Sequence, residues 1–213
     1  MSPSKELSPL ESLPQYLLGE IISRVAKSGR NHVRHCFQVS HELAIACKDE
    51  RVSKELNLKQ LAMNPLATVH NYQRLMEKCL QNGNAEAHYI EGVKQYFYHN
   101  NTPSGLHHLQ ASAEGLYEKG IYLYGILMLC RGETDTGKQY LDKLQWVKST
   151  TRSDRCWTNI KLSLQGIHII MQPSYFQSIR DIKPNKICTL NDMDTRCKKC
   201  YYYKQMRKFV NRI

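Results

Sequence analysis

Two stretches of the sequence repeat each other at an interval of 32 to 33 residues. Residues 87–109 align with residues 120–141, so that Gly92 matches Gly125, Gly105 matches Gly137 and Leu109 matches Leu141. Each copy reads as a helix, a short polar turn and a second helix. A period of this length is typical of helical hairpins that stack into a solenoid, because one hairpin alone cannot bury its apolar face. The repeat therefore predicts an all-α fold.

Glycines recur at the same places in both copies. Gly92 and Gly125 fall inside the first helix of each copy, where glycine costs about 1 kcal/mol relative to alanine. A close approach between two helices is the usual compensation for that cost. We therefore expect these glycines to lie where the helices of a hairpin touch.

A second constraint comes from residues 13–26, LPQYLLGEIISRVA. Leu17, Ile21 and Val25 recur every four residues, and Leu18 and Ile22 run beside them. This spacing predicts an amphipathic helix with a wide apolar stripe. Each of the five side chains is worth about 1.5–3 kcal/mol when fully buried. The stripe can thus hold a small helical bundle and still leave apolar surface for a partner.

The same segment resembles a known module. Leu13-Pro14, the apolar helix and the pair Val39-Ser40 are similar to an F-box, and the similarity covers residues 10–58. Leu43 stands where most F-boxes carry Trp or Phe. The resemblance implies a three-helix unit that docks on the Skp adaptor of cullin-based ubiquitin ligases. The residues it assigns to the adaptor contact are Leu13, Pro14, Leu17, Leu18, Ile21, Ile22 and Val25.

The repeats also resemble a family. Their glycine spacing and the segment ASAEG at residues 111–115 are similar to Sel1-like repeats, which are relatives of the tetratricopeptide repeat. An F-box followed by such repeats resembles a group of short plant F-box proteins. This resemblance implies a non-catalytic subunit of a ubiquitin ligase. Its F-box would bind the Skp adaptor and, through it, cullin, while the repeats or the tail would hold an unidentified target protein.

The sequence predicts four parts. Residues 1–9 form a disordered lead-in, and residues 10–60 form the F-box. Residues 66–170 form the repeat domain, and residues 171–213 form an irregular basic tail that contains cysteines. Asn64-Pro65 breaks the chain between the F-box and the repeats. Within the repeat domain, one helix is expected over residues 66–80. Another, within residues 146–170, would cap the last apolar face of the solenoid.

Composition bounds where the protein acts. No run approaches 18 consecutive apolar residues, so we expect no membrane span. The first residues lack the apolar core of a signal peptide. The eight cysteines are therefore predicted to be reduced thiols, as is usual in the nucleus or cytoplasm. We find no glycine-rich phosphate loop and no catalytic motif, so the sequence predicts neither an enzyme nor a cofactor.

The last part of the chain suggests two further functions, nucleic-acid binding and zinc binding. Lys and Arg exceed Asp and Glu by 11, and residues 196–213 hold seven basic residues and no acidic one. With Tyr201, Tyr202 and Tyr203 beside these charges, the tail could stack on single-stranded nucleic acid. A basic nucleic-acid-binding protein is thus the second functional hypothesis, although a protein-binding tail is favoured. Cys188, Cys197 and Cys200 are candidate ligands of a structural zinc ion that lacks a fourth nearby ligand.

Overall fold

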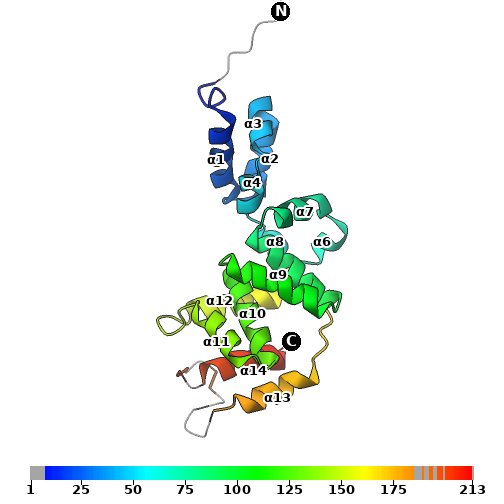
Figure 1. Ribbon diagram of the computed structural model, residues 1–213, viewed down its shortest axis with the longest axis vertical. Helices are drawn as coiled ribbons and strands as arrows, with labels where there is room; N and C mark the ends of the chain where they lie inside the picture. Colours follow the sequence, from blue (N-terminus) through cyan, green and yellow to red (C-terminus); the bar gives the residue numbers. More distant parts are fainter. Residues whose placement is uncertain (1–7, 185–188, 190–191, 194–195, 199, 213) are drawn as a thin grey trace, which may run out of the picture.

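The structure is a computed structural model that describes residues 8–184, 189, 192–193, 196–198 and 200–212. Among these residues every regular element is helical and none is a strand. The predicted all-α class is confirmed. The molecule is elongated, with a small helical bundle at one end, the hairpins in the middle and the last two helices at the opposite end (Figure 1).

The N-terminal bundle, residues 15–55, contains four short helices: α1 (Gln15–Ala26), α2 (Arg30–Val39), α3 (His41–Ala46) and α4 (Glu50–Glu55). The expected three-helix unit is corrected here, because residues 41–55 form two helices. Asp49 is the reason for the break. Its side chain accepts a hydrogen bond from the Arg51 backbone N–H and so caps a new helix.

Helix α1 packs closely against α4 at Gly19. A Cβ atom at this position would lie 2.3 Å from Oδ2 of Asp49. Arg51 closes the contact, since its guanidinium donates hydrogen bonds to the carboxylates of Asp49 and Glu20 and to the Tyr16 carbonyl. The Arg51 hydrogen bond is the main reason that the pKa of Asp49 is lowered. The contact between α1 and α4 is therefore made by charged, hydrogen-bonded side chains beside Gly19, whose lack of a side chain leaves room for the Asp49 carboxylate.

The helices that follow the bundle are α5 (Lys59–Met63), α6 (Ala67–His70), α7 (Gln73–Gln81), α8 (Ala85–Val93), the π-helix η1 (Lys94–Tyr98), α9 (Thr102–Glu114), α10 (Glu118–Cys130), α11 (Thr134–Asp142) and α12 (Thr151–Ser163). The single helix expected over residues 66–80 is interrupted at Tyr72, which adopts a left-handed backbone with φ of 65°. A bulky residue in this region ends a right-handed helix.

Both hairpins have the glycine contacts that the repeat predicts. A Cβ atom on Gly92 would lie 2.7 Å from Cγ of Leu109, and one on Gly125 would lie 3.0 Å from Cγ of Leu141. In the second helices, Gly105 meets Tyr96 and Gly137 meets Leu129 in the same way. The alignment is confirmed, because matched residues make matched contacts.

The π-helix η1 explains why the interval changes from 33 to 32 within the repeat. Helix α8 and η1 together span residues 85–98, whereas α10 spans residues 118–130, one residue fewer. The turns that follow, residues 99–101 and 131–133, are equally long. A π-turn accommodates one extra residue inside a helix. The first copy therefore carries its extra residue inside the helix and not in the turn.

Two further helices form the predicted tail: α13 (Pro173–Asp181) and α14 (Tyr201–Arg212). The expectation of an irregular tail is therefore wrong. Helix α14 contacts α10 and α13, and Tyr201, Met206 and Phe209 are fully buried. The expected capping helix, α12, ends at Ser163 and packs on α10, and α14 covers a further part of the apolar core.

The bundle and the hairpins are joined by buried hydrogen bonds. The Asn84 side chain donates to the carbonyls of Ser53 and Leu56 at the end of the bundle. It also accepts from the Ala87 N–H and so caps α8. The Glu86 carboxylate accepts from the Leu58 N–H, and its pKa is raised by burial. Because Asn84 and Glu86 begin α8, the first hairpin starts at a fixed place on the bundle.

Candidate interaction surface

The seven predicted contact residues of the N-terminal helix occupy different environments. Leu18 and Ile22 are 0% and 2% exposed and lie in the core of the bundle. Leu13, Ile21 and Val25 are partly buried, and Pro14 and Leu17 are exposed. The prediction is corrected for Leu18 and Ile22, because a side chain that the bundle encloses cannot touch a partner directly.

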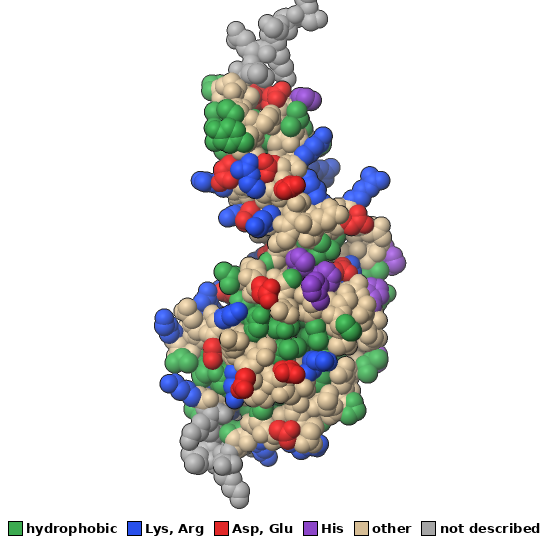
Figure 2. Space-filling view, viewed as in Figure 1, with side chains coloured by type: hydrophobic (Ala, Val, Ile, Leu, Met, Phe, Trp, Pro, Cys, Tyr) green, Lys and Arg blue, Asp and Glu red, His purple; other side chains and the backbone are tan. Residues whose placement is uncertain are grey.

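Exposed apolar side chains gather at the end of the bundle that faces away from the hairpins. Tyr16 is 65% exposed, Leu17 36%, Phe37 50% and Val39 66%. Helix α2 runs back along α1, so its last turn lies near the first turn of α1. The Gln15 side chain, which donates to the Glu42 carbonyl, ties the two regions together. These four residues are called the distal apolar surface, and Figure 2 shows hydrophobic side chains at this end, over the start of α1.

Helix α2 has an unusual place in the bundle. None of its residues is buried, although it carries Val33, Cys36, Phe37 and Val39. Val33 and Cys36 pack partly against the core, whereas Phe37 and Val39 face solvent. An amphipathic helix is normally held by the burial of its apolar face. This helix leaves part of that face uncovered, which is typical of a surface that meets another protein.

Sequence reasoning found only one of the four residues of the distal apolar surface. The resemblance to an F-box assigned Leu17 to the adaptor contact, but not Tyr16, Phe37 or Val39. Tyr16 lies beside the apolar stripe and not within it, and Phe37 and Val39 lie on a different helix from the stripe. Only the positions of α3 and α4 decide which residues of a wide stripe are covered.

Helix α14 brings the basic end of the chain into the core of the hairpins. Tyr201 stacks on Trp146 with 3.8 Å between ring centroids, and its hydroxyl contacts the Ser153 hydroxyl. The Gln205 side chain accepts a hydrogen bond from the Tyr122 hydroxyl. Tyr201 and Tyr203 are buried. They are therefore not available to stack on nucleic acid, which corrects the basis of the second functional hypothesis.

Two of the basic side chains of this segment contact one carboxylate. Arg196 donates two hydrogen bonds to Asp154, and Nζ of Lys208 lies 3.2 Å from the same group. Burial raises the pKa of Asp154, but the hydrogen bonds and charges of Arg196 and Lys208 outweigh it, and the pKa is lowered. The predicted irregular basic tail thus takes part in an internal ion-pair cluster.

The candidate zinc ligands are only partly placed. The sulfur atoms of Cys197 and Cys200 lie 3.4 Å apart at the start of α14. Cys188 lies outside the described residues. Within the described part of the chain, no group of three or more His, Cys, Asp or Glu side chains is arranged to hold a metal ion. The zinc hypothesis stays a prediction.

A histidine pair lies on the first hairpin, which sequence reasoning did not single out. Nδ1 of His88 on α8 and Nδ1 of His108 on α9 are 3.0 Å apart. Burial is the main cause that lowers the pKa of both rings. Only the pairing of α8 with α9 brings these side chains together, so no local sequence pattern could reveal the contact.

The described helices include none that is long and apolar enough to cross a membrane.

Comparison with known proteins gives two agreeing findings. A family model described as plant tetratrico peptide repeats matches residues 58–165. An F-box protein of Arabidopsis thaliana is 39% identical over 163 residues, which cover 76% of this chain and 99% of that protein. A second Arabidopsis protein, provisionally named an F-box protein, is 32% identical over 58% of this chain and 41% of its own length. No solved structure matches the chain.

Proposed function

Because this chain belongs to the plant F-box proteins that carry tetratricopeptide-type repeats, we propose that it is a substrate-recognition subunit of an SCF-type ubiquitin ligase. In this role it binds a Skp adaptor through its N-terminal bundle and, through the adaptor, a cullin. The repeat region holds a target protein. The chain itself performs no catalysis, and it acts in the nucleus or cytoplasm.

The distal apolar surface is the observation that carries this proposal. Tyr16, Leu17, Phe37 and Val39 are exposed at one end of a bundle whose helix α2 has no buried residue. Aromatic and aliphatic side chains that lose their water on binding contribute most of the free energy at protein interfaces. We assign the direct adaptor contact to these four residues and Pro14. Leu18 and Ile22 support the surface by holding α1 in the bundle.

The proposal for target binding names a region of the chain and no individual contact residues. The repeat region is proposed to be of the Sel1-like type, which rests on the glycine register and on ASAEG at residues 111–115. Helix α14 already covers part of α10 and packs against α12 through Tyr201 and Ser153. A target protein would therefore bind elsewhere on the hairpins, or would have to displace α14.

Two substitutions test the adaptor contact without touching the core. We expect Leu17→Asp and Phe37→Asp each to weaken binding of a purified Skp adaptor by more than tenfold, because the new carboxylate would be desolvated without a partner. Isothermal titration calorimetry measures the affinity. Far-UV circular dichroism and a melting curve measure whether the variant is folded.

Gln139→Asp is the matched control, because it adds the same charge at an exposed position of α11. We expect it to bind like the unsubstituted chain. Leu18→Asp serves as the opposite case, since it places a charge in the core and should lose helicity and binding together. A folded Leu17→Asp and a folded Phe37→Asp that both keep full affinity would refute the assignment of this surface.

A further inference from the structure

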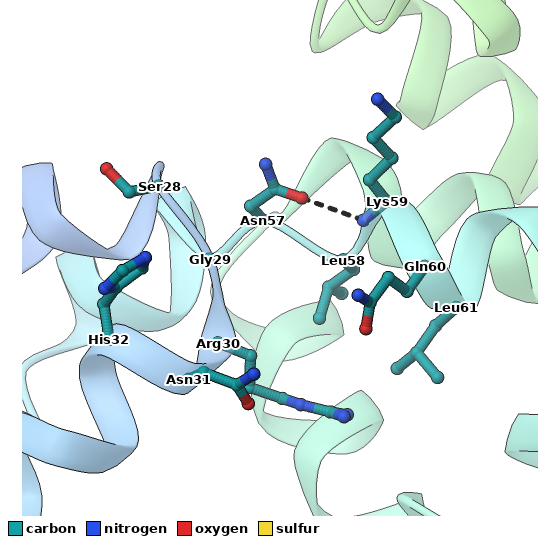
Figure 3. A pocket seen from close by; sticks show the side chains of 10 residues that line it. All are labelled: Ser28, Gly29, Arg30, Asn31, His32, Asn57, Leu58, Lys59, Gln60 and Leu61. Carbon is teal, nitrogen blue, oxygen red and sulfur yellow. Dashed lines mark hydrogen bonds between the residues drawn. The ribbon is translucent and has the colours of Figure 1, made fainter.

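A cavity of about 370 Å³ lies where the N-terminal bundle meets the first helix after it. One wall is the turn between α1 and α2 with the start of α2, residues 28–32. The other wall is the link to α5 with its first residues, residues 57–61 (Figure 3). This joint pocket lies away from the distal apolar surface, at the opposite end of the bundle.

The lining of the joint pocket is polar and carries no negative charge. It contains Arg30, His32 and Lys59, together with the neutral hydrogen-bonding side chains of Ser28, Asn31, Asn57 and Gln60. No Asp or Glu is among the lining residues. Such a set of groups attracts an anion, because nothing within the pocket neutralises the guanidinium.

Arg30 is the centre of the argument. In Figure 3 its side chain extends from the start of α2 toward the α5 side, from which Gln60 and Leu61 approach it. Its Nη1 atom is buried and has no hydrogen-bond partner in the described part of the chain. Arg30 also makes no ion pair with any described carboxylate within 4.0 Å. A buried guanidinium N–H without an acceptor is costly, and a small shift of the side chain toward the cavity would let an oxyanion supply the missing acceptor.

The guanidinium is held in place before any ligand binds. Its Cζ atom lies 4.6 Å from the centre of the Tyr72 ring, a cation–π contact. Tyr72 is the residue with the left-handed backbone between α6 and α7. A planar guanidinium fixed on an aromatic ring presents its remaining N–H groups in one orientation, which suits the two-point binding of a phosphate group.

We propose that the joint pocket binds a phosphate group through Arg30. The first turn of α2 adds to the attraction, since Gly29 supplies no side-chain cap and the N-terminus of a helix favours an anion. Lys59 extends away from Arg30 to the rim, where it contributes charge and no direct contact. The rest of the cavity leaves room for a small organic group on the phosphate, because small-molecule sites begin at about 300 Å³.

The test uses the full chain and two probes, inorganic phosphate and O-phosphoserine. Melting curves are recorded with each probe at constant ionic strength, with chloride as the replaced anion, so that general screening is the same in every sample. We expect a saturable rise in melting temperature with both probes, and none with serine. A larger rise with phosphoserine would support use of the remaining cavity, and a rise with inorganic phosphate alone would support a site for the free ion.

Variants connect the effect to the pocket. We expect Arg30→Gln to weaken phosphate binding by about tenfold or more, and Arg30→Lys to weaken it less, because lysine keeps the charge but loses the two-point contact. Arg34→Gln is the control, since it removes an exposed arginine from the same helix. Equal shifts in the unsubstituted chain and in a folded Arg30→Gln, or no shift with either probe, would overturn the proposal. Adaptor binding is not read in this experiment, so its result is independent of the proposed ligase function.

Discussion

At His88 and His108, two imidazole rings meet on one hairpin with 3.0 Å between their Nδ1 atoms. At this distance one nitrogen donates and the other accepts, so both rings cannot be protonated without breaking the contact. Burial lowers the pKa of His88, and the charges of His108 and His107 lower it further. Burial also lowers the pKa of His108, with His107 and Lys94 acting in the same direction and Glu91 against them.

The lowered pKa values imply a loss of stability in mild acid. Histidine in an unfolded chain has a pKa near 6.5. When the folded pKa is lower, the unfolded state binds more protons in this range, so stability is full above about pH 6.5 and falls as the pH drops through the folded pKa. We expect the melting temperature to fall between about pH 6.5 and pH 5, and to fall less in a His88→Gln, His108→Gln double variant.

His70→Gln is the control for the histidine pair, because this ring is exposed and its charge is not among the causes that shift the pKa of either paired ring. The measurement is a series of melting curves in buffers of equal ionic strength. An identical pH dependence in the double variant and the unsubstituted chain would show that the pair does not carry the effect.

For single residues, the sequence predicted the contacts within one hairpin better than it predicted which residues of the N-terminal helix are buried. The repeat predicted that Gly92 and Gly125 lie at helix contacts, because glycine is costly inside a helix without a close neighbour. Only the structure shows that Leu109 and Leu141 are the neighbours. The division of the first helix into buried Leu18 and exposed Leu17 does not follow from the sequence. Its stripe is wide, and α3 and α4 cover only part of it.

At the scale of elements, α14 depends on an unusually polar contact with the hairpins. Its segment brings Arg196 and Lys208 to Asp154, and these two cations are 3% and 10% exposed, whereas Asp154 is 40% exposed. Removing one partner of a buried ion pair is more harmful than removing both, because a desolvated charge remains. The carboxylate that both cations share is thus a key contact of this helix.

We expect Asp154→Asn to destabilise the fold by about 1–3 kcal/mol, a value below that of a fully buried pair because Asp154 is partly solvated. Urea denaturation measures the loss, and amide hydrogen exchange shows whether α14 opens before the hairpins. Asp135→Asn is the control, since Asp135 is exposed and makes no ion pair among the described residues. Equal stability in the two variants would mean that the cluster does not hold α14.

Helix α14 shows how composition can mislead where spacing does not. Tyr201, Met206, Phe209 and Val210 lie at helical intervals and predict an apolar face. Seven basic residues in the same segment favoured an irregular, protein-binding tail instead. Long basic side chains can cover apolar surface with their aliphatic stems and meet a carboxylate with their ends, so positive charge does not exclude a helix from the core.

Taken as a whole, the molecule depends on the joint between its bundle and its hairpins. Asn84 makes three buried hydrogen bonds there, two to carbonyls of the bundle and one that caps α8. The sequence predicted a break at Asn64-Pro65 but not these bonds, because they join residues that are about 30 positions apart. One side chain therefore connects the stability of the two parts.

We expect Asn84→Ala to lower the free energy of unfolding by about 2–4 kcal/mol and to broaden or split the calorimetric transition, because buried carbonyls of the bundle lose their donor. Asn101→Ala is a close control. Asn101 caps α9 in the same way, but its side chain is exposed and makes no other hydrogen bond within the described part of the chain. We expect Asn101→Ala to lower the free energy of unfolding by about 1 kcal/mol. A single transition with equal losses in both variants would argue against coupling through the joint.

The position of α14 also sets the order in which the chain can complete its fold during synthesis. Every residue of α10 from Lys119 to Cys130 is buried, and α14 is one of the helices that packs on it. Translation proceeds at roughly 5–20 residues per second, so α10 leaves the ribosome several seconds before the residues that cover it. The N-terminal bundle is completed earlier, because Asn84, which donates to its last carbonyls, follows them by only about 30 residues. Nascent chains that stop before Tyr201 would thus present a folded bundle beside an apolar helix that is only partly covered, a combination that chaperones and proteases of the cell recognise.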